Sequence, residues 1–209
     1  MNKRSSEFRQ RRRDAAAEQL LEAAETVIAR VGYEAVTMGE VAQAAGCATG
    51  TLYLYFKDKQ QLVMALVERH GRIFRDRVKA SMAGTADPME KLRRSTRTAL
   101  EYFAENRNYF KVLFASNLYR RGIIPGALPK GEQEERKRFQ AAFLELIRQA
   151  QAGGQIRKDF PPEEIQKFMR GCMIGTLDQL GMLETLPPTE EILHVYWAFL
   201  TDGMGTHGK

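Results

Sequence analysis

The feature that most constrains the fold of this chain is the helical spacing of its apolar residues between glycine and proline breakers. Residues 20–31 show the pattern, because Leu20, Ala24, Val27, Ile28 and Val31 would share one side of a helix. No segment has the sustained alternation of apolar and polar residues that marks a β-strand, and helix-favouring residues dominate between the breakers. The sequence therefore predicts an all-α fold.

The breakers and capping residues divide the chain into about nine predicted helices. Glycines end several of them, and Thr37, Asp58 and Asp87 stand where N-caps are expected. A Gly/Pro-rich stretch at 122–131 reads as the one long loop. The predicted helices run at about 14–30, 37–45, 48–55, 58–84, 88–103, 109–118, 132–152, 161–182 and from 187 onward.

The composition is typical of a soluble globular protein, with 44% hydrophobic and 28% charged residues in 209. No apolar stretch approaches the roughly 20 residues of a membrane span, and the polar, basic N-terminus is unlike a secretory signal. Cys47 and Cys172 lie far apart and form neither a metal motif nor a disulfide framework. A reducing, cytoplasmic location is expected.

The positive charge is concentrated at the N-terminus. Residues 1–13 hold six basic residues and one acidic residue, so this arm carries +5 of the net +6. Such an arm is either a disordered, solubilising tail or a segment that binds phosphates.

Residues 37–62 carry most of the functional information. Gly46 separates two short predicted helices by a turn of three or four residues, which is the arrangement of a helix-turn-helix. Crossing helices would bury Val41, Ala42, Ala45, Leu52 and Phe56. Outside that core fall neutral residues that can approach phosphates or base edges: Thr49, Gly50, Thr51, Tyr53 and Tyr55.

Purely structural roles are the alternative for several of these residues. Phe56 follows Leu52 by four residues and is expected in the core. Tyr53 and Tyr55 could be core aromatics, although both cannot share the inward face with Leu52 and Phe56. Lys59 is either a solvated first-turn residue or a phosphate contact.

The first 65 or so residues resemble the DNA-binding domain of the tetracycline-repressor (TetR) family of bacterial regulators. The resemblance rests on Gly32-Tyr33, Thr37, Ala44-Ala45-Gly46, Gly50-Thr51-Leu52-Tyr53, Tyr55-Phe56, Lys59 and Leu62. The predicted nine-helix layout agrees over the full length, whereas the C-terminal two-thirds match only in architecture. With this resemblance, a role of Arg9–Arg13 at phosphates or in the minor groove is favoured over a solubilising one.

The resemblance implies specific DNA contacts. Thr37, Tyr55 and Lys59 are expected at phosphates, and the residues expected to face the groove are Ala48, Thr49, Gly50, Thr51 and Tyr53. Two positions depart from the family: many members have lysine in place of Thr49, and often an aromatic in place of Leu54. Leu54 could contact a thymine methyl, and the operator cannot be borrowed from a relative.

The rest of the chain shows no catalytic set. His70, His194 and His207 are scattered, and there is neither a glycine-rich phosphate loop nor a nucleophile elbow. No enzyme activity, metal or cofactor is therefore predicted. Aromatic and methionine residues on these helices either form the core of a bundle or line an effector pocket. The candidate ligand-binding residues are Tyr102, Phe103, Phe110, Phe114, Phe143, Met169 and Met173.

The last two predicted helices are candidates for a dimer surface. Gly171 and Gly175 leave a smooth strip, and the final helix is apolar over more than one face. The resemblance implies that the two helices pair with their twofold mates; complete burial within one chain is the alternative. The candidate interface residues are Phe168, Gly171, Cys172, Gly175, Thr176, Leu180, Tyr196, Trp197 and Leu200.

The predicted organisation is a basic arm at 1–13, a DNA-binding domain at 14–74 and an effector-binding and dimerisation domain at 75–209. The expected protein is a homodimeric transcriptional repressor, released from a palindromic operator in double-stranded DNA by a small-molecule effector. Activation instead of repression stays open, as do the effector and the operator sequence. A helical protein-interaction or RNA-binding module that uses the arm alone is the alternative from a different class.

Overall fold

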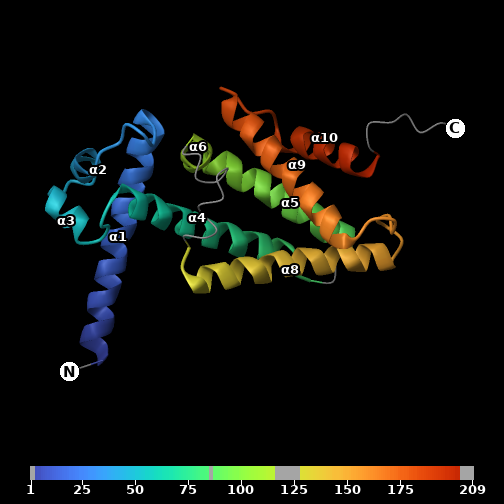
Figure 1. Ribbon diagram of the computed structural model, residues 1–209, viewed down its shortest axis with the longest axis horizontal. Coiled ribbons are helices and arrows are strands. Elements are labelled where there is room, and N and C mark those ends of the chain that lie inside the picture. Colours follow the sequence, from blue (N-terminus) through green and yellow to red (C-terminus); the bar gives the residue numbers. More distant parts are fainter. Residues whose placement is uncertain (1–2, 85–86, 116–127, 203–209) are drawn as a thin grey trace. The chain divides into compact units, whose positions relative to one another are not determined.

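In the computed structural model, residues 3–84, 87–115 and 128–202 are described. These residues form helices and no strand, which confirms the predicted all-α fold (Figure 1). The helices are α1 (Lys3–Val31), α2 (Met38–Ala44), α3 (Thr49–Tyr53), α4 (Lys59–Ser81), α5 (Pro88–Glu105), α6 (Arg107–Ala115), α8 (Lys130–Ala152), α9 (Pro162–Met182) and α10 (Thr189–Thr201). Most of the loop predicted at 122–131 lies outside the described residues.

Two compact units make up the chain. The first comprises Met1–His70 and Asn108–Leu128, and the second comprises Gly71–Arg107 and Pro129–Lys209. The division falls within α4, four residues before the predicted domain limit at 74. Residues 108–115 belong to the first unit, whereas they were predicted to lie in the second domain.

The first unit is built on α1, which buries Leu20, Ala24, Val27 and Ile28. The helix begins at Lys3, so the predicted start at Asp14 is wrong. No breaker separates the arm from the apolar stripe, and the side chain of Gln10 donates to Asp14 Oδ1 at 2.7 Å, one turn further on. The basic arm is therefore the first turns of a long helix over its described residues.

The turns of the first unit follow the predicted chemistry. Gly32 ends α1 with φ +87°, a conformation that residues with a Cβ rarely adopt. Thr37 and Glu40 form the predicted capping box at the start of α2. Asp58 Oδ1 accepts from the backbone N–H of Gln61 at 2.7 Å, and α4 begins there.

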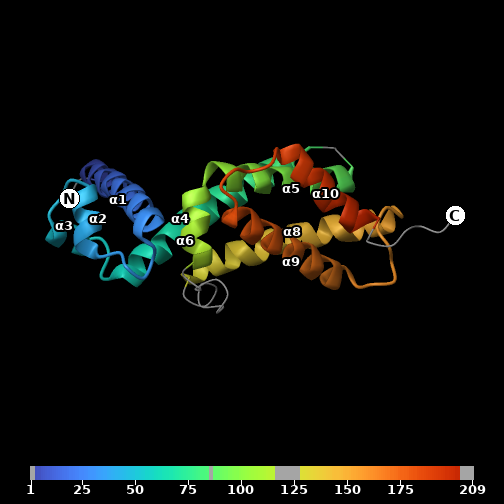
Figure 2. The ribbon, with the colours of Figure 1, turned by 90° about the horizontal axis from the view of Figure 1, so that it is seen from above.

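The second unit is a helical bundle in which α8 packs against α5 and α9, and α10 packs against α5 (Figure 2). Asp87 caps α5 by accepting from the Glu90 N–H at 3.1 Å, and Pro88 occupies its first turn. Arg97 of α5 forms an ion pair with Glu190 of α10. The core includes Leu92, Leu100, Phe103, Ile147 and Leu193. Among the described helices, none combines the length and the apolar character needed to cross a bilayer.

Candidate nucleic-acid interface

The helix-turn-helix has a small, fully buried core. Val41, Ala42 and Leu52 have almost no exposed surface, and Phe56 is also buried, as predicted; Ala45 is half-buried. The turn depends on Gly46, whose φ is +68°, and the Cys47 N–H donates to the Ala42 carbonyl at 2.9 Å. This core fixes α3 against α2, so the outer side of α3 is held rigidly.

A neutral recognition surface, which we define as Ala48, Thr49, Gly50, Thr51, Tyr53 and Leu54, lies outside that core. All six residues are exposed. Tyr53 is 51% exposed, so its interpretation as a core aromatic is wrong, while Tyr55 is half-buried. A Cβ built on Gly50 would meet no atom of the chain within 4 Å, so nothing inside the protein requires glycine there. The space beside its backbone is open to a partner.

The arm reaches this surface. The Arg13 guanidinium lies over the ring of Tyr55, 5.9 Å from its centroid. Arg9, Arg11 and Arg12 are exposed on the same helix. The contact places the end of the basic arm beside a predicted phosphate contact, in the geometry of a cation–π pair. Arg13 and Tyr55 are 42 positions apart, so no local sequence pattern could have predicted this contact.

Two predicted phosphate contacts also have structural partners. Lys59 Nζ donates to the carbonyl oxygens of Tyr33 at 2.9 Å and Glu34 at 3.0 Å, and it lies over the Tyr33 ring. Burial, followed by the nearby carboxylates of Glu34 and Asp58, raises the pKa of the Tyr33 phenol. An ammonium has three donors, so one N–H of Lys59 is left for a phosphate.

Thr37 is similarly engaged. Its hydroxyl accepts from the Glu40 N–H at 3.2 Å and donates to the Glu40 carboxylate at 2.8 Å. These hydrogen bonds from Thr37 lower the pKa of the exposed Glu40 carboxyl. Thr37 is predicted from the sequence both as an N-cap and as a phosphate contact, and the two roles compete for one hydroxyl proton.

Comparison with known proteins agrees with this geometry. The family model described as "Bacterial regulatory proteins, tetR family" matches residues 20–66. The match places residues 20–66 among sequences similar to the DNA-binding part of TetR-family regulators. The chain is 34% identical over 96 residues to the uncharacterized HTH-type transcriptional regulator Rv1255c of Mycobacterium tuberculosis, covering 46% of this chain and 48% of the relative. It is 36% identical over 74 residues to the fatty acid metabolism regulator protein of Bacillus subtilis, covering 35% and 38%.

These matches span about half or less of the curated relatives' length. A longer likeness is structural. The fatty acid degradation regulator FadR from Bacillus halodurans superimposes with a TM-score of 0.76, covering 90% of this chain and 96% of that one, at 23% identity. That likeness concerns the fold alone. These relatives are all named as regulators, which agrees with the expectation that the chain is not an enzyme.

One buried cluster was not predicted from the sequence. His70 of α4 is buried, its Nε2 lies 2.9 Å from Glu25 Oε2 of α1, and its ring stacks on Tyr109 of α6 at 3.9 Å. Beside it, Arg69 pairs with Glu18 at 2.7 Å. The partners are 45 and 39 positions from His70, so only the packed fold brings them together. Within the part of the chain that the structure describes, no group of three or more His, Cys, Asp or Glu could hold a metal ion.

The seven predicted ligand-binding residues are distributed over both units, and all of them are at least half-buried. Tyr102, Phe103 and Phe110 are buried, and the other four are half-buried. Tyr102 packs edge-on against Phe74 at 5.6 Å, as core aromatics do. None of the seven lines the cavity between α9 and α10.

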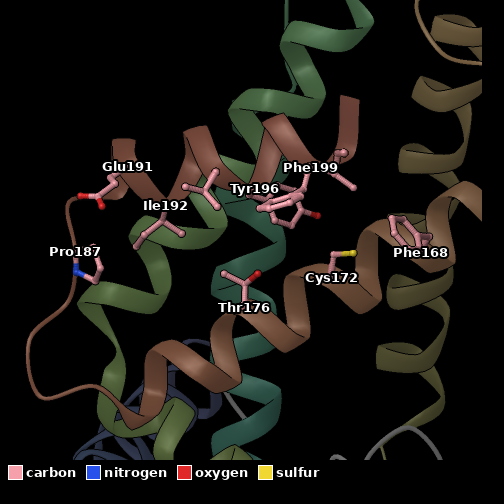
Figure 3. A pocket seen from close by; sticks show the side chains of 10 residues that line it. Phe168, Cys172, Thr176, Pro187, Glu191, Ile192, Tyr196 and Phe199 are labelled. Atoms are coloured by element: carbon pink, nitrogen blue, oxygen red, sulfur yellow. The ribbon is translucent and has the colours of Figure 1, made fainter. Parts of the chain in front are cut away.

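That cavity lies on the predicted dimer surface (Figure 3). Cys172 and Thr176 of α9 face Ile192 and Tyr196 of α10, and Phe168 and Phe199 stand at one end. Phe168 is 63% and Phe199 is 56% exposed. We call this area, together with Gly171, Gly175 and Leu200, the α9–α10 surface.

The candidate interface residues range from exposed to buried, and Cys172, Thr176 and Leu200 are half-buried. Gly171 and Gly175 are exposed, and a Cβ at either would meet no atom within 4 Å. Leu180, Tyr196 and Trp197 are buried within their own chain. Burial raises the pKa of the Tyr196 phenol, which donates to the Met169 carbonyl at 2.8 Å. The exposed surface of α10 is instead carried by Val195 and Phe199, because α10 turns its other side towards α5.

Proposed function

We propose that this chain is a sequence-specific DNA-binding transcriptional regulator located in the cytoplasm. The observation that carries the proposal is the exposed, neutral recognition surface on α3, with the arginine-rich end of the arm at its side. Arginines hold the phosphates of any sequence, whereas hydroxyl and methyl groups on a helix can read base edges in the major groove. The match of residues 20–66 to the TetR family model supports this assignment.

The regulator is proposed to act as a homodimer through the α9–α10 surface. Exposed aromatic residues and an open glycine strip suit close packing of two helix pairs. Each protomer then presents one α3 to a half-site, and the half-sites are related by the same twofold axis. The operator is therefore palindromic.

A small-molecule effector is proposed to release the operator, which makes the protein a repressor. The helix α4 runs without interruption from Lys59 to Ser81, and its His70 contacts α1 through Glu25 and α6 through Tyr109. A movement of α6 would thus displace His70 and change the positions of α4 and α1. The coupling requires a free-energy difference of only about 1–3 kcal/mol between the two states. The Bacillus relatives are named as fatty acid regulators, and a Thermus thermophilus FadR of similar fold is titled as a complex with lauroyl-CoA. Fatty acyl-CoAs are therefore the first effectors to test.

A selection experiment tests the proposal. The full chain is incubated with a pool of random-sequence duplexes, and the bound fraction is amplified and sequenced. We expect one palindromic consensus whose half-site centres lie one helical turn, about 34–36 Å, or a multiple of it apart. Recovery of no consensus, or equal competition by RNA, would assign the arm to a nonspecific or RNA-binding role and refute the proposal.

Effector release is tested on the selected duplex. Saturated acyl-CoAs of increasing chain length are titrated into the complex, with free CoA as the control. We expect dissociation by the acylated compounds alone. Dissociation by none of them would refute this effector class and leave DNA recognition untouched.

A further inference from the structure

The recognition surface lacks every side chain that reads a base with paired hydrogen bonds. Arginine and lysine recognise guanine in this way, asparagine and glutamine recognise adenine, and aspartate and glutamate accept from cytosine. Residues 45–56 contain none of these six residue types. What α3 exposes is hydroxyl groups and carbon.

Most charged groups next to α3 are already hydrogen-bonded within the protein. Glu40 is bound to Thr37, and the Asp58 carboxylate accepts from the Gln61 N–H. Lys59 is held at the carbonyl oxygens of Tyr33 and Glu34. Gln43 and Lys57 are the exposed groups that flank α3, before and after it. Gln43 belongs to α2, and the first helix of such a motif crosses the DNA backbone instead of entering the groove.

Leu54 is the most exposed large hydrophobic residue of the described chain, at 75%. It directly follows α3, whose five residues span only about 7.5 Å at 1.5 Å per residue. The major groove is about 12 Å wide, so both ends of this helix fit inside it. Thr49 at the start and Leu54 at the end therefore both come within reach of base edges.

We infer that Leu54 and Thr49 read thymine methyl groups, so that the half-site beneath α3 is rich in A·T pairs and is recognised chiefly through apolar contacts. The thymine 5-methyl is the apolar group among the base edges of the major groove, and burying it against exposed carbon removes both from water. This inference rests on the proposed DNA-binding function and specifies how that function discriminates sequences.

Uracil substitution tests the inference on the selected duplex. Deoxyuridine replaces one thymidine at a time, which removes the methyl group and keeps every hydrogen-bonding group. We expect a loss of affinity of about fourfold at each thymine that α3 contacts, the effect of one buried carbon. In Leu54→Ala, one of these losses should disappear, because the methyl no longer has its partner.

Substitutions at Thr49 separate its methyl from its hydroxyl. Thr49→Val keeps the methyl group and should retain binding to within about twofold, whereas Thr49→Ser should lose about as much as the uracil duplex. Both positions are exposed, and circular dichroism checks that each variant is folded.

Two results would overturn the inference alone: a consensus indifferent to uracil at every position, or a guanine-rich consensus whose recognition depends on Lys57 or Gln43. Failure to select any DNA sequence would instead overturn the proposed function, and this inference with it.

Discussion

The recognition surface and the α9–α10 surface both expose large hydrophobic side chains, yet they differ in their surroundings. Tyr53 and Leu54 stand among hydroxyl groups, close to Tyr55 and Arg13 of the basic arm. Phe168 and Phe199 border an apolar groove and a strip of glycines whose backbone is open. Exposure of an aromatic residue is thus not enough to identify its partner. The neighbouring charges and the shape of the backbone favour DNA in the first case and a second protein chain in the second.

The largest effect is expected for a substitution at Gly175 on the α9–α10 surface. Replacing it with leucine should not disturb the single chain, because nothing lies within 4 Å of the added Cβ. In a twofold interface the same leucine enters from both partners. Overpacking costs about 1–3 kcal/mol per site, or about 2–6 kcal/mol for the two equivalent sites of the dimer, so dimerisation should weaken by about thirtyfold to twenty-thousandfold. Sedimentation should show monomer with unchanged helical content, and operator binding should disappear with the dimer.

Gly131→Leu is the matched control. Gly131 is also helical, exposed and free of atoms within 4 Å, but it lies in α8. This variant should stay dimeric. A dimeric Gly175→Leu protein with reduced thermal stability would show that α9 packs within its own chain, and the α9–α10 surface would lose its assignment.

A substitution in the recognition surface should reduce specific DNA binding without affecting the dimer. Tyr53→Ala should reduce specific operator affinity by about ten- to hundredfold, the value of one good base contact, while the dimer and the nonspecific affinity persist. Phe160→Ala, which removes another half-exposed aromatic in the second unit, should have no effect on DNA binding. Fluorescence anisotropy with specific and scrambled duplexes measures both. If Tyr53→Ala unfolds, Tyr53 is needed for the stability of the fold, and its assignment to the recognition surface would be wrong.

The two surfaces were not equally predictable from sequence. The recognition surface is local: Gly46 sets the turn, and Leu52 and Phe56 fix which residues point inward, so the exposed set follows from the spacing. The α9–α10 surface depends on how α10 packs against α5, which joins residues about 90 positions apart, as in the Arg97–Glu190 pair. The apolar pattern of α10 could not show that Tyr196 and Trp197 face inward while Phe199 faces out.

The first residues of the helices were also predictable only where local sequence marks them. The start of α5 was predicted because Asp87 and Pro88 mark it chemically. The start of α1 was missed, since the arm offers no breaker and its arginines favour helix as well as solvent. In such a segment, charge repulsion opposes the helix and helix propensity favours it. Contacts such as that of Arg13 with Tyr55 add to the balance, and the sequence does not show them.

The salt dependence of DNA binding tests the role of the basic arm. Replacing Arg11, Arg12 and Arg13 by glutamine should weaken binding to every duplex by a similar factor. The slope of log K against log salt should fall by about 0.9 for each phosphate that the arm no longer neutralises. An equal removal of charge at Arg93, Lys130 and Lys158, exposed residues of the second unit, is the control and should leave the slope nearly unchanged. An unchanged slope in the arm variant would assign the arm to solubility.

The smallest effect concerns Thr37, where capping and phosphate binding compete. Thr37→Ala removes an N-cap, which costs about 0.5–2 kcal/mol of stability, whereas Thr37→Ser keeps the hydroxyl and should be nearly neutral. The pKa of Glu40 is lowered in the folded state by these hydrogen bonds from Thr37. The contribution of ionised Glu40 to the free energy of unfolding is therefore fully present above the ordinary pKa of a glutamate. It is lost as the pH falls through the lowered pKa of the folded state.

Thr37→Ala should consequently raise the pKa of Glu40 towards its ordinary value and reduce the loss of stability in acid. A nuclear magnetic resonance titration of Glu40, together with denaturation at several pH values, measures both effects. At neutral pH, comparison of the alanine and serine variants on specific DNA then separates the two roles. If Thr37 only caps α2, the affinity loss should follow the stability loss and vanish when α2 is stabilised by low temperature. A loss that persists with α2 fully formed would show that the hydroxyl leaves Glu40 to bind a phosphate.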